Sequence, residues 1–227
     1  MTAGYRVADI GTDHAYIPIH LAQSGKIPGA VAMDVNRGPL ERAEENIRKH
    51  QLEDRIKTRL SDGFSALKEG EADSAVIAGM GGGLVTRILK DGGCLVRTLK
   101  ECILQPQSEI EKVRAFLLEE GFLFIKEDMV EEDGKYYPIM KVTPPMGRMG
   151  RMPGTGETWD ETELRYGRYL LRDRNPVLRQ YLEREIRIKI QIAESLQGQD
   201  SPRTAERKGE LEKEIEYAEK GMKYYAV

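Results

Sequence analysis

Short apolar runs alternate with helical patterns over the first 142 residues of the chain. The apolar runs are typical of buried strands and predict strands over 6–10, 30–34, 56–60, 74–78 and 102–104. Between them, apolar residues three and four positions apart predict helices over 17–24, 39–50, 84–89 and 108–120. Strands and helices that alternate in this way form a mostly parallel sheet.

Two further segments, 122–130 and 135–142, alternate apolar and polar residues like the two strands of a hairpin. Five parallel strands closed by an antiparallel pair give a mostly parallel, Rossmann-like sheet of seven strands with an antiparallel last strand. A dehydrogenase sheet would normally be parallel throughout. The strand count therefore favours the α/β fold of a class I methyltransferase.

The composition changes after this sheet. Residues 143–158 are rich in Pro, Gly, Met and Arg, which predicts a linker, and three helical segments follow, two of them over 161–173 and 177–197. The last two helices carry apolar stripes, the final one at coiled-coil spacing, and should pack as an antiparallel hairpin that leaves the chain a monomer. The stripes consist of Leu182, Ile186, Ile190, Ala193 and Leu196, and of Leu211, Ile215, Ala218, Met222 and Tyr225. The predicted domains are 1–145 and 146–227.

The net charge of −3 gives no hint of a nucleic-acid partner, but the distribution of charge does. Residues 1–145 carry 19 basic and 23 acidic side chains, whereas residues 146–227 carry 16 and 15. Residues 165–189 hold eight basic and three acidic side chains, which suits a polyanion such as RNA or an ordinary solvated helix face. The candidate RNA-binding side chains are Arg165, Arg168, Arg172, Arg179, Arg187 and Lys189.

Residues 9–16 (DIGTDHAY) follow the first strand and open the first helix, where nucleotide cofactors bind in such sheets. Gly11 allows a tight turn and a close approach of ligand to backbone N–H groups. Asp13 stands where the dinucleotide fingerprint has its second glycine. A carboxylate there would repel a pyrophosphate and attract the ammonium and sulfonium charges of S-adenosylmethionine. The alternative is an ordinary turn between a strand and a helix.

Acidic residues also follow the second and third predicted strands. Asp34 ends the second strand, where an acid commonly accepts hydrogen bonds from ribose hydroxyls. Asp62 follows the third strand, and its carboxylate could accept a hydrogen bond from an adenine amino group. Ligands of open α/β sheets bind at the carboxyl ends of the strands, so both residues indicate a nucleoside beside residues 9–16.

The fourth strand ends in a glycine-rich turn, AGMGGG, over residues 78–83. Many enzymes that methylate amino groups carry an Asn-Pro-Pro-Tyr type motif here, and its absence argues against methylation of adenine N6 or cytosine N4. The glycines leave room for a flat base, or simply make a flexible turn before a helix. After the fifth strand, the amides of Gln105 and Gln107 could read a base edge or stabilise their own turn.

Other common chemistries lack their residues in this sequence. His14, His20 and His50 have no metal-ligand spacing, and no Ser-His-Asp order suggests a hydrolase, so no metal is expected. Cys94 and Cys102 are most simply reduced thiols of a cytoplasmic protein. Neither a signal peptide nor an apolar stretch of roughly 18 residues is present, so no membrane partner is expected.

Six segments, in order along nearly the whole chain, carry a family resemblance: VADIGTDHAY, VAMDVN, SDGF, IAGMGG, LQPQ and the stretch ELRYGRYLL…NPVL…YL. They closely resemble TrmK, the family of bacterial tRNA (adenine-22-N1)-methyltransferases. The resemblance implies S-adenosylmethionine as the cofactor, tRNA as the partner and a C-terminal coiled-coil hairpin that holds tRNA. It also implies a short helix before the first strand, which could contribute to either site; the sequence here starts almost at that strand. The residues expected to bind the cofactor are Asp9, Gly11, Thr12, Asp13, His14, Asp34, Val35, Asp62, Gly63, Gly79, Met80 and Gly81.

Methylation at adenine N1 sets requirements of its own. The base must leave any pairing, because N1 lies on the Watson–Crick edge, and in-line placement of N1 supplies much of the rate. The attack creates a cationic adenine that must lose a proton, and a nearby carboxylate would stabilise it. Asp13 is the candidate catalytic residue, with His14 second, although direct transfer could need no base.

Three other functions fit parts of the sequence. A small-molecule methyltransferase would not need the helical appendage, and its activity would survive removal of residues 146–227. A non-catalytic RNA-binding protein would not bind S-adenosylmethionine, and the presence of Asp34 and Asp62 argues against it. A dehydrogenase is disfavoured by Asp13.

Overall fold

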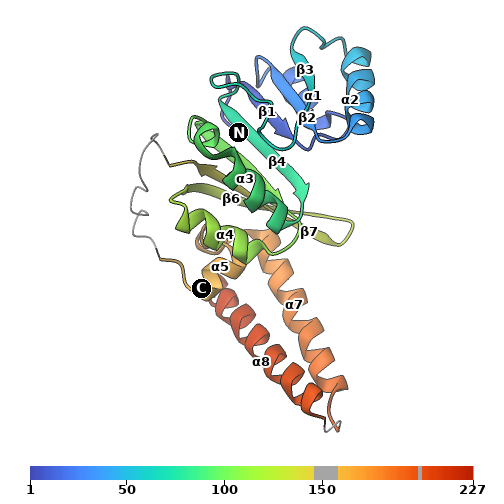
Figure 1. Ribbon diagram of the computed structural model, residues 1–227. Coiled ribbons are helices and arrows are strands. Elements are labelled where there is room, and N and C mark those ends of the chain that lie inside the picture. The colour runs from blue at the N-terminus through green and yellow to red at the C-terminus, as the bar shows by residue number, and fades with distance from the viewer. Residues whose placement is uncertain (146–157, 199–200, 227) are drawn as a thin grey trace. The chain divides into compact units, whose positions relative to one another are not determined.

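A seven-stranded sheet with the strand order β3-β2-β1-β4-β5-β7-β6 organises the computed structural model, which describes residues 1–145, 158–198 and 201–226 (Figure 1). The strands are β1 (Val7–Ile10), β2 (Ala30–Asp34), β3 (Ile56–Leu60), β4 (Ser74–Met80), β5 (Glu101–Pro106), β6 (Leu123–Glu132) and β7 (Lys135–Thr143). The helices are α1 (Tyr16–Gln23), α2 (Arg37–Lys49), α3 (Gly82–Val96), α4 (Ile110–Glu119), α5 (Glu161–Tyr166), α6 (Arg168–Arg172), α7 (Pro176–Ser195), α8 (Pro202–Met222) and η1 (Lys223–Tyr225).

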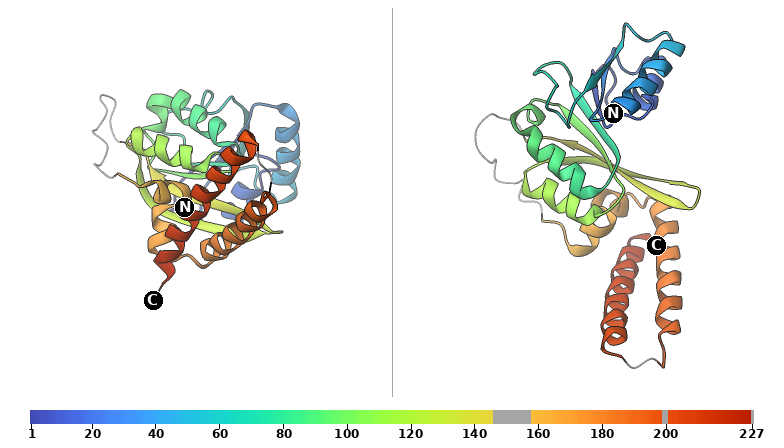
Figure 2. Two further views of the ribbon diagram at one scale, coloured as in Figure 1. Left: turned by 90° about the horizontal axis from the view of Figure 1, so that it is seen from below. Right: turned by 45° about the vertical axis from the view of Figure 1, so that its right-hand side comes forward.

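The first five strands run parallel, as the alternating pattern predicts. β1 lies between β2 and β4, and all four of its residues are buried, as expected for a central parallel strand. β7 pairs antiparallel with β5 through Cys102, Ile103 and Leu104. The helices α3 and α4 pack side by side next to β4 and β5 (Figures 1 and 2). The predicted Rossmann-like sheet with an antiparallel ending is confirmed.

Two glycine positions explain where the helices differ from the prediction. α3 extends to Val96, well beyond the predicted 84–89, although Gly93 inside it has a left-handed φ of 44°. Its apolar face simply continues past this local break. In the C-terminal part, the predicted helix 161–173 is two helices, because Gly167 has a φ of 94° that no helix accommodates.

The chain divides into two compact units. Unit 1 comprises Met1–Lys126 and Ile139–Glu157, and unit 2 comprises Glu127–Pro138 and Thr158–Val227. The tip of the β6–β7 hairpin therefore belongs with the C-terminal helices, whereas the predicted division after residue 145 assigned it to the first domain. Most of the predicted linker lies outside the described residues, as does part of the predicted break between the last two helices.

Within unit 2, α7 and α8 pack along each other in opposite directions, as predicted (Figure 2). Leu182, early in α7, faces Gly221 at the end of α8, where an added Cβ would lie 3.1 Å from the leucine side chain. Two turns further along α7, Nζ of Lys189 lies 3.0 Å from the carboxylate of Glu214. The neighbouring Ile190, which belongs to the predicted apolar stripe, is 40% exposed.

An ion pair in unit 1 holds the connection between β3 and β4. Arg59 on β3 donates two hydrogen bonds of 2.6 Å to the carboxylate of Glu71 and one of 2.9 Å to the carbonyl of Ala66. These bonds fix the ends of the segment that carries Asp62. The hydrogen bonds from Arg59 also lower the pKa of Glu71 from its ordinary 4.5 to about 2.

We predict that Glu71→Gln lowers the free energy of unfolding by about 1–2 kcal/mol at neutral pH. The folded-state pKa of Glu71 is depressed, so its stabilisation is complete above the unfolded pKa and is lost as the pH falls from 4.5 towards 2. Urea denaturation of both proteins over this range checks the prediction. A stability difference that does not shrink in acid would show that the charge of Glu71 is not what stabilises the connection.

Candidate functional site

The turn after β1 joins three strands of the sheet. Gly11 has a φ of 74°, and the backbone N–H groups of Gly11 and Thr12 both donate to the carbonyl of Met33 on β2, at 2.7 and 2.9 Å. A Cβ on Gly11 would lie 1.9 Å from Cε of Met80 at the end of β4. Glycine is therefore required twice, for the left-handed turn and for the close approach of β4. These two N–H groups are already used, so other groups must meet a ligand here.

Asp9 presents a buried carboxylate at the end of β1. Its residue is 5% exposed, and this burial raises the pKa of Asp9 from its ordinary 3.8 to about 6. The Thr12 hydroxyl faces the carboxylate and offsets part of the shift, but makes no well-formed hydrogen bond with any group in the described part of the chain. Buried polar groups are almost always satisfied in folded proteins. A polar or cationic ligand fits beside this pair, where it would supply the missing partner.

Asp13 and His14 lie in a strained turn between β1 and α1. His14 and Ala15 both have left-handed φ values, 60° and 55°, which non-glycine residues seldom adopt. The turn is held from α2, because Nδ2 of Asn46 donates to the His14 carbonyl at 3.0 Å and Arg42 donates to Asp13 at 3.0 Å. Asp13 nevertheless remains exposed. The sequence analysis missed Arg42 and Asn46, since both act from about 30 residues away.

Asp34 ends β2, as predicted, and is half-buried. Its Oδ1 accepts a hydrogen bond of 2.7 Å from the backbone N–H of Asn36, which fixes the carboxylate at the start of the β2–α2 turn. Its carbonyl accepts from Ser61 at 2.9 Å and so ties this turn to the end of β3. Val35 is exposed beside it. The predicted ribose-binding acid therefore lies at the carboxyl edge of the sheet.

Asp62 is exposed in the turn after β3 and lines a cavity of about 350 Å³ between this turn and α3. The neighbouring Gly63 has a φ of 54°, and a Cβ there would lie 3.2 Å from the side chain of Ile88. The Ser61 hydroxyl donates to the Gly63 carbonyl at 2.8 Å and keeps the turn tight. The turn thus presents Asp62 towards a cavity large enough for part of a ligand.

The glycine turn after β4 is braced by the segment that follows β5. The backbone N–H of Gly79, whose φ is 78°, donates to Oε1 of Gln105 at 2.9 Å. The backbone N–H of Gln107 in turn donates to the carbonyl of Met80 at 2.8 Å. Gln105 therefore stabilises the backbone of the turn, the second of the two roles that its sequence position allowed. Gln107 is exposed beside the turn, and a Cβ on Gly79 would lie 3.9 Å from its Nε2.

The start of α3 is packed equally closely against the same segment. A Cβ on Gly82 would lie 2.4 Å from the carbonyl oxygen of Ser108. The Gly82 N–H also donates to the Ser108 hydroxyl at 3.3 Å. Only glycine fits here, so this glycine serves packing rather than flexibility.

The four predicted aspartates lie near one edge of unit 1: Asp34 ends β2, Asp13 and Asp62 follow β1 and β3, and Asp9 is the last residue but one of β1. β1 lies between β2 and β4, and the order of connections reverses there. Ligands of open α/β sheets bind in the crevice outside such a switch point. Four carboxyl groups give this edge a negative potential, which favours a cationic ligand over a pyrophosphate.

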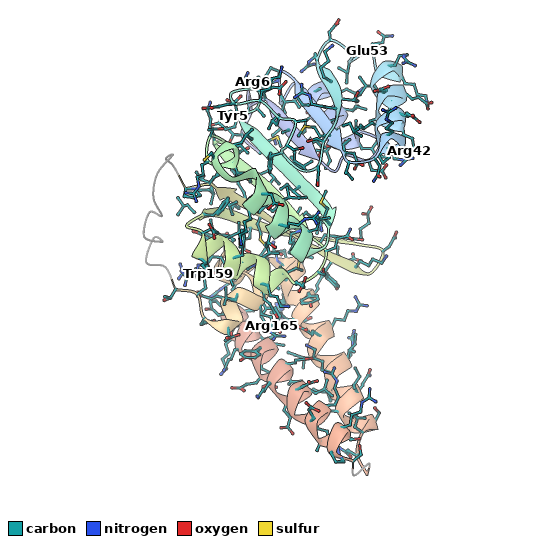
Figure 3. All side chains as sticks on the ribbon, in the orientation of Figure 1. Tyr5, Arg6, Arg42, Glu53, Trp159 and Arg165 are labelled. Atoms are coloured by element: carbon teal, nitrogen blue, oxygen red, sulfur yellow. The ribbon has the colours of Figure 1, made fainter. Side chains whose placement is uncertain are left out.

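Three of the predicted RNA-binding side chains have partners inside unit 2. Arg168 is 8% exposed, donates to the carboxylate of Glu163 at 2.6 and 2.8 Å, and lies over the Trp159 ring. Arg165 is half-buried, with its guanidinium over an aromatic ring; Figure 3 shows it in the helical part near Trp159. Lys189 sits in the α7–α8 interface. These three charges stabilise unit 2 itself.

The other three predicted side chains are exposed. Arg172 lies 3.8 Å from a carboxylate oxygen of Glu163, and Arg179 pairs with Glu183 one turn along α7, at 2.9 Å. Arg187 is exposed on the same helix. Exposed ion pairs of this kind contribute little to stability, so these arginines can exchange their partners for phosphates.

The described residues contain neither a metal-binding cluster nor a membrane-spanning helix. No group of three or more His, Cys, Asp or Glu side chains there could hold a metal ion. None of the helices in this part of the chain is both long and apolar enough to cross a bilayer.

A family model described as TrmK, tRNA (adenine(22)-N(1))-methyltransferase, matches residues 7–220. The tRNA (adenine(22)-N(1))-methyltransferase of Bacillus subtilis (strain 168) is 39% identical over 137 residues, 60% of this chain and 58% of that protein. The matches to curated relatives span 58–61% of the relatives' own lengths.

Two solved structures are similar over nearly the whole chain. One is a candidate tRNA (m1A22) methyltransferase of Streptococcus pneumoniae in complex with S-adenosyl-L-methionine. It is 30% identical, with a TM-score of 0.80 and coverage of 97% of this chain and 94% of that one. The other is TrmK of M. capricolum in complex with S-adenosyl-homocysteine. It is 27% identical, with a TM-score of 0.79 and coverage of 99% and 93%.

We predict that Asp9→Asn stabilises the ligand-free protein at pH 8, by at most roughly 3 kcal/mol. The folded-state pKa of Asp9 is raised, so keeping it ionised costs free energy above pH 6, and this cost vanishes as the pH falls towards 4. Urea denaturation at pH 8 and pH 4 checks the prediction, with Asp54→Asn, which changes an exposed aspartate before β3, as the control. An Asp9→Asn protein less stable than wild type at pH 8 would contradict it.

Proposed function

Because the chain belongs to the TrmK family of tRNA (adenine(22)-N(1))-methyltransferases, we propose that it transfers a methyl group from S-adenosylmethionine to N1 of an adenine in tRNA. The family description names position 22 of the tRNA as the target. The observation that carries the proposal is the buried Asp9 carboxylate beside the Gly11 turn, at the switch point of the sheet. A buried anion with an unsatisfied hydroxyl next to it suits the cationic cofactor and disfavours a pyrophosphate.

Each aspartate of this edge has a proposed role in holding the cofactor. Asp9 attracts the positive charges of the methionine part, and Thr12 donates its unused hydroxyl. Asp34 accepts hydrogen bonds from the ribose hydroxyls, and Asp62 accepts one from the adenine amino group of the cofactor. S-adenosylmethionine, when bound, supplies a methyl group on a positively charged sulfur.

The chain positions the target adenine at the β4 side of the same edge. The glycine turn around Gly79, braced by Gln105, leaves room for a flat base there. N1 is on the Watson–Crick edge, so the base must rotate out of the tRNA to reach the site. Asp13, held by Arg42, stabilises the positive charge that the adenine acquires and accepts its proton, either directly or through His14.

The exposed arginines of unit 2, Arg172, Arg179 and Arg187, are the proposed phosphate contacts. Their contribution to tRNA affinity should fall steeply with salt, because each contact releases a counterion from the RNA. A flat salt response would remove them from the binding surface. A tRNA substrate would place the enzyme in the cytoplasm, and a hairpin that closes on itself suits a monomer.

The direct test is methyl transfer from labelled S-adenosylmethionine to unmodified bacterial tRNA, followed by mass spectrometry of the nucleosides. We expect 1-methyladenosine, and no label on a tRNA in which adenine 22 is replaced by guanine. A methylated nucleoside other than 1-methyladenosine would overturn the proposed reaction. Cofactor binding without any transfer to tRNA would overturn the proposed substrate.

We predict that Asp13→Ala lowers kcat roughly 100-fold or more, as expected for loss of a proton acceptor near the reacting base. The dissociation constant of S-adenosylmethionine should change much less, because Asp13 is exposed and acts on the target adenine. Calorimetric titration and steady-state kinetics separate the two effects. Glu41→Ala, which removes an exposed carboxylate from α2, is the matched control. Equal losses of kcat and cofactor affinity would instead make Asp13 a cofactor ligand.

A further inference from the structure

Tyr16, the first residue of α1, exposes 63% of its surface beside the candidate site. Its ring stacks on that of His14, with the ring centroids 5.1 Å apart and the planes 9° from parallel. A large aromatic ring left in water buries little apolar surface. The exposed Tyr16 ring, stacked on His14, can therefore bury its open face against a third flat group. None of the roles proposed above uses Tyr16.

The backbone is arranged to present this pair. Ala15, between the two aromatic residues, is fully buried, whereas Tyr16 is exposed and His14 is half-buried behind it. The left-handed φ values of His14 and Ala15 make this turn possible, and the contact from Asn46 to the His14 carbonyl supports it. α1 also begins without a side-chain cap, so nothing in helix formation itself requires this geometry. Non-glycine residues held in left-handed conformations by their surroundings are common at functional sites.

The pair also lies at the edge where the target base is expected. Tyr16 begins the helix that follows the turn of Gly11 and Asp13, and Gly11 lies against Met80 of the β4 glycine turn. The stack is therefore on the rim shared by the ends of β1 and β4. A base that leaves the tRNA stack loses its neighbours, and an aromatic ring at this rim replaces them.

We propose that the Tyr16 ring, backed by His14, is the stacking surface for the adenine that is methylated. This inference rests on the proposed function and identifies how the same site holds its substrate base. The adenine gains positive charge as N1 takes the methyl group, and the face of an aromatic ring attracts a cation. Tyr16 therefore binds the adenine more strongly in the transition state than in the ground state, and contributes to kcat as well as to KM.

The test compares Tyr16→Ala, Tyr16→Phe and Tyr5→Ala by steady-state kinetics with tRNA at saturating S-adenosylmethionine. Tyr5 precedes β1 at the opposite end of that strand, where Figure 3 labels it, and provides the matched loss of a tyrosine ring. We expect kcat/KM for tRNA to fall roughly tenfold to hundredfold in Tyr16→Ala, the usual effect of losing a stacked base. Tyr16→Phe and Tyr5→Ala should stay within about twofold of wild type, because the ring is kept or lies elsewhere.

Two further measurements separate stacking from other roles. The dissociation constant of S-adenosylmethionine should be the same for Tyr16→Ala and wild type. A loss of cofactor affinity as large as the loss of kcat/KM for tRNA would make Tyr16 a cofactor contact. A tRNA with 2-aminopurine at the target position should be quenched by wild type and Tyr16→Phe but not by Tyr16→Ala, since stacking on an aromatic ring quenches this base.

Each outcome bears on one of the two proposals. An active wild type with an unimpaired Tyr16→Ala variant overturns the stacking inference alone. A Tyr16→Phe variant as impaired as Tyr16→Ala assigns the role to the hydroxyl and also overturns it. A wild-type protein that transfers no methyl group to tRNA overturns the proposed function, and the stacking role with it.

Discussion

The burial of one carboxylate, Asp9, is the constraint on which the candidate site depends. Its position at the end of the central strand β1 keeps water away and raises its pKa to about 6. A fold gains nothing from an unpaired buried acid, because ionising it costs free energy at neutral pH. A bound cation explains why Asp9 is buried despite this cost of ionisation. A cationic cofactor offsets the cost of desolvation when it binds, which the apoprotein alone cannot do.

The rest of the edge is built around that carboxylate by backbone contacts. Gly11 lets β1 turn while Met80 approaches, and the carbonyl of Met33 satisfies the two N–H groups that the turn would leave open. Gln105 holds the glycine turn after β4 in the same manner. Groups that do not touch a ligand, the Met33 carbonyl and the Gln105 side chain, therefore fix the ends of β1, β2 and β4. The exposed groups, Asp13 and Tyr16, are then free to meet the substrate.

Local patterns predicted the central strands well because β1, β2 and β4 are short, largely buried and apolar. β3 (IKTRL) is mostly polar and has one buried residue, yet it also begins and ends at the predicted residues, as β2 does. The predicted extent of α3 was wrong, because the apolar face continues to Val96 on the far side of the local break at Gly93. The aspartates could be found because motif and strand end coincide. Their supports could not, since Arg42 lies 29 residues from Asp13 and Gln105 lies 26 residues from Gly79. Arg168 was expected at the surface but is buried, because a sequence does not show that Glu163 pairs with it.

The most direct measurement of the role of Asp9 is the number of protons released when S-adenosylmethionine binds. Calorimetric titrations at pH 6 in buffers of different ionisation enthalpy give this number. Asp9 is half-protonated at pH 6 in the free protein, and a bound cation would keep it ionised. We expect about half a proton to be released per cofactor at pH 6, where the cofactor's amino group stays protonated, and none from Asp9→Asn at that pH. Equal release from wild type and Asp9→Asn at pH 6 would show that the buried carboxylate does not receive the cofactor's charge.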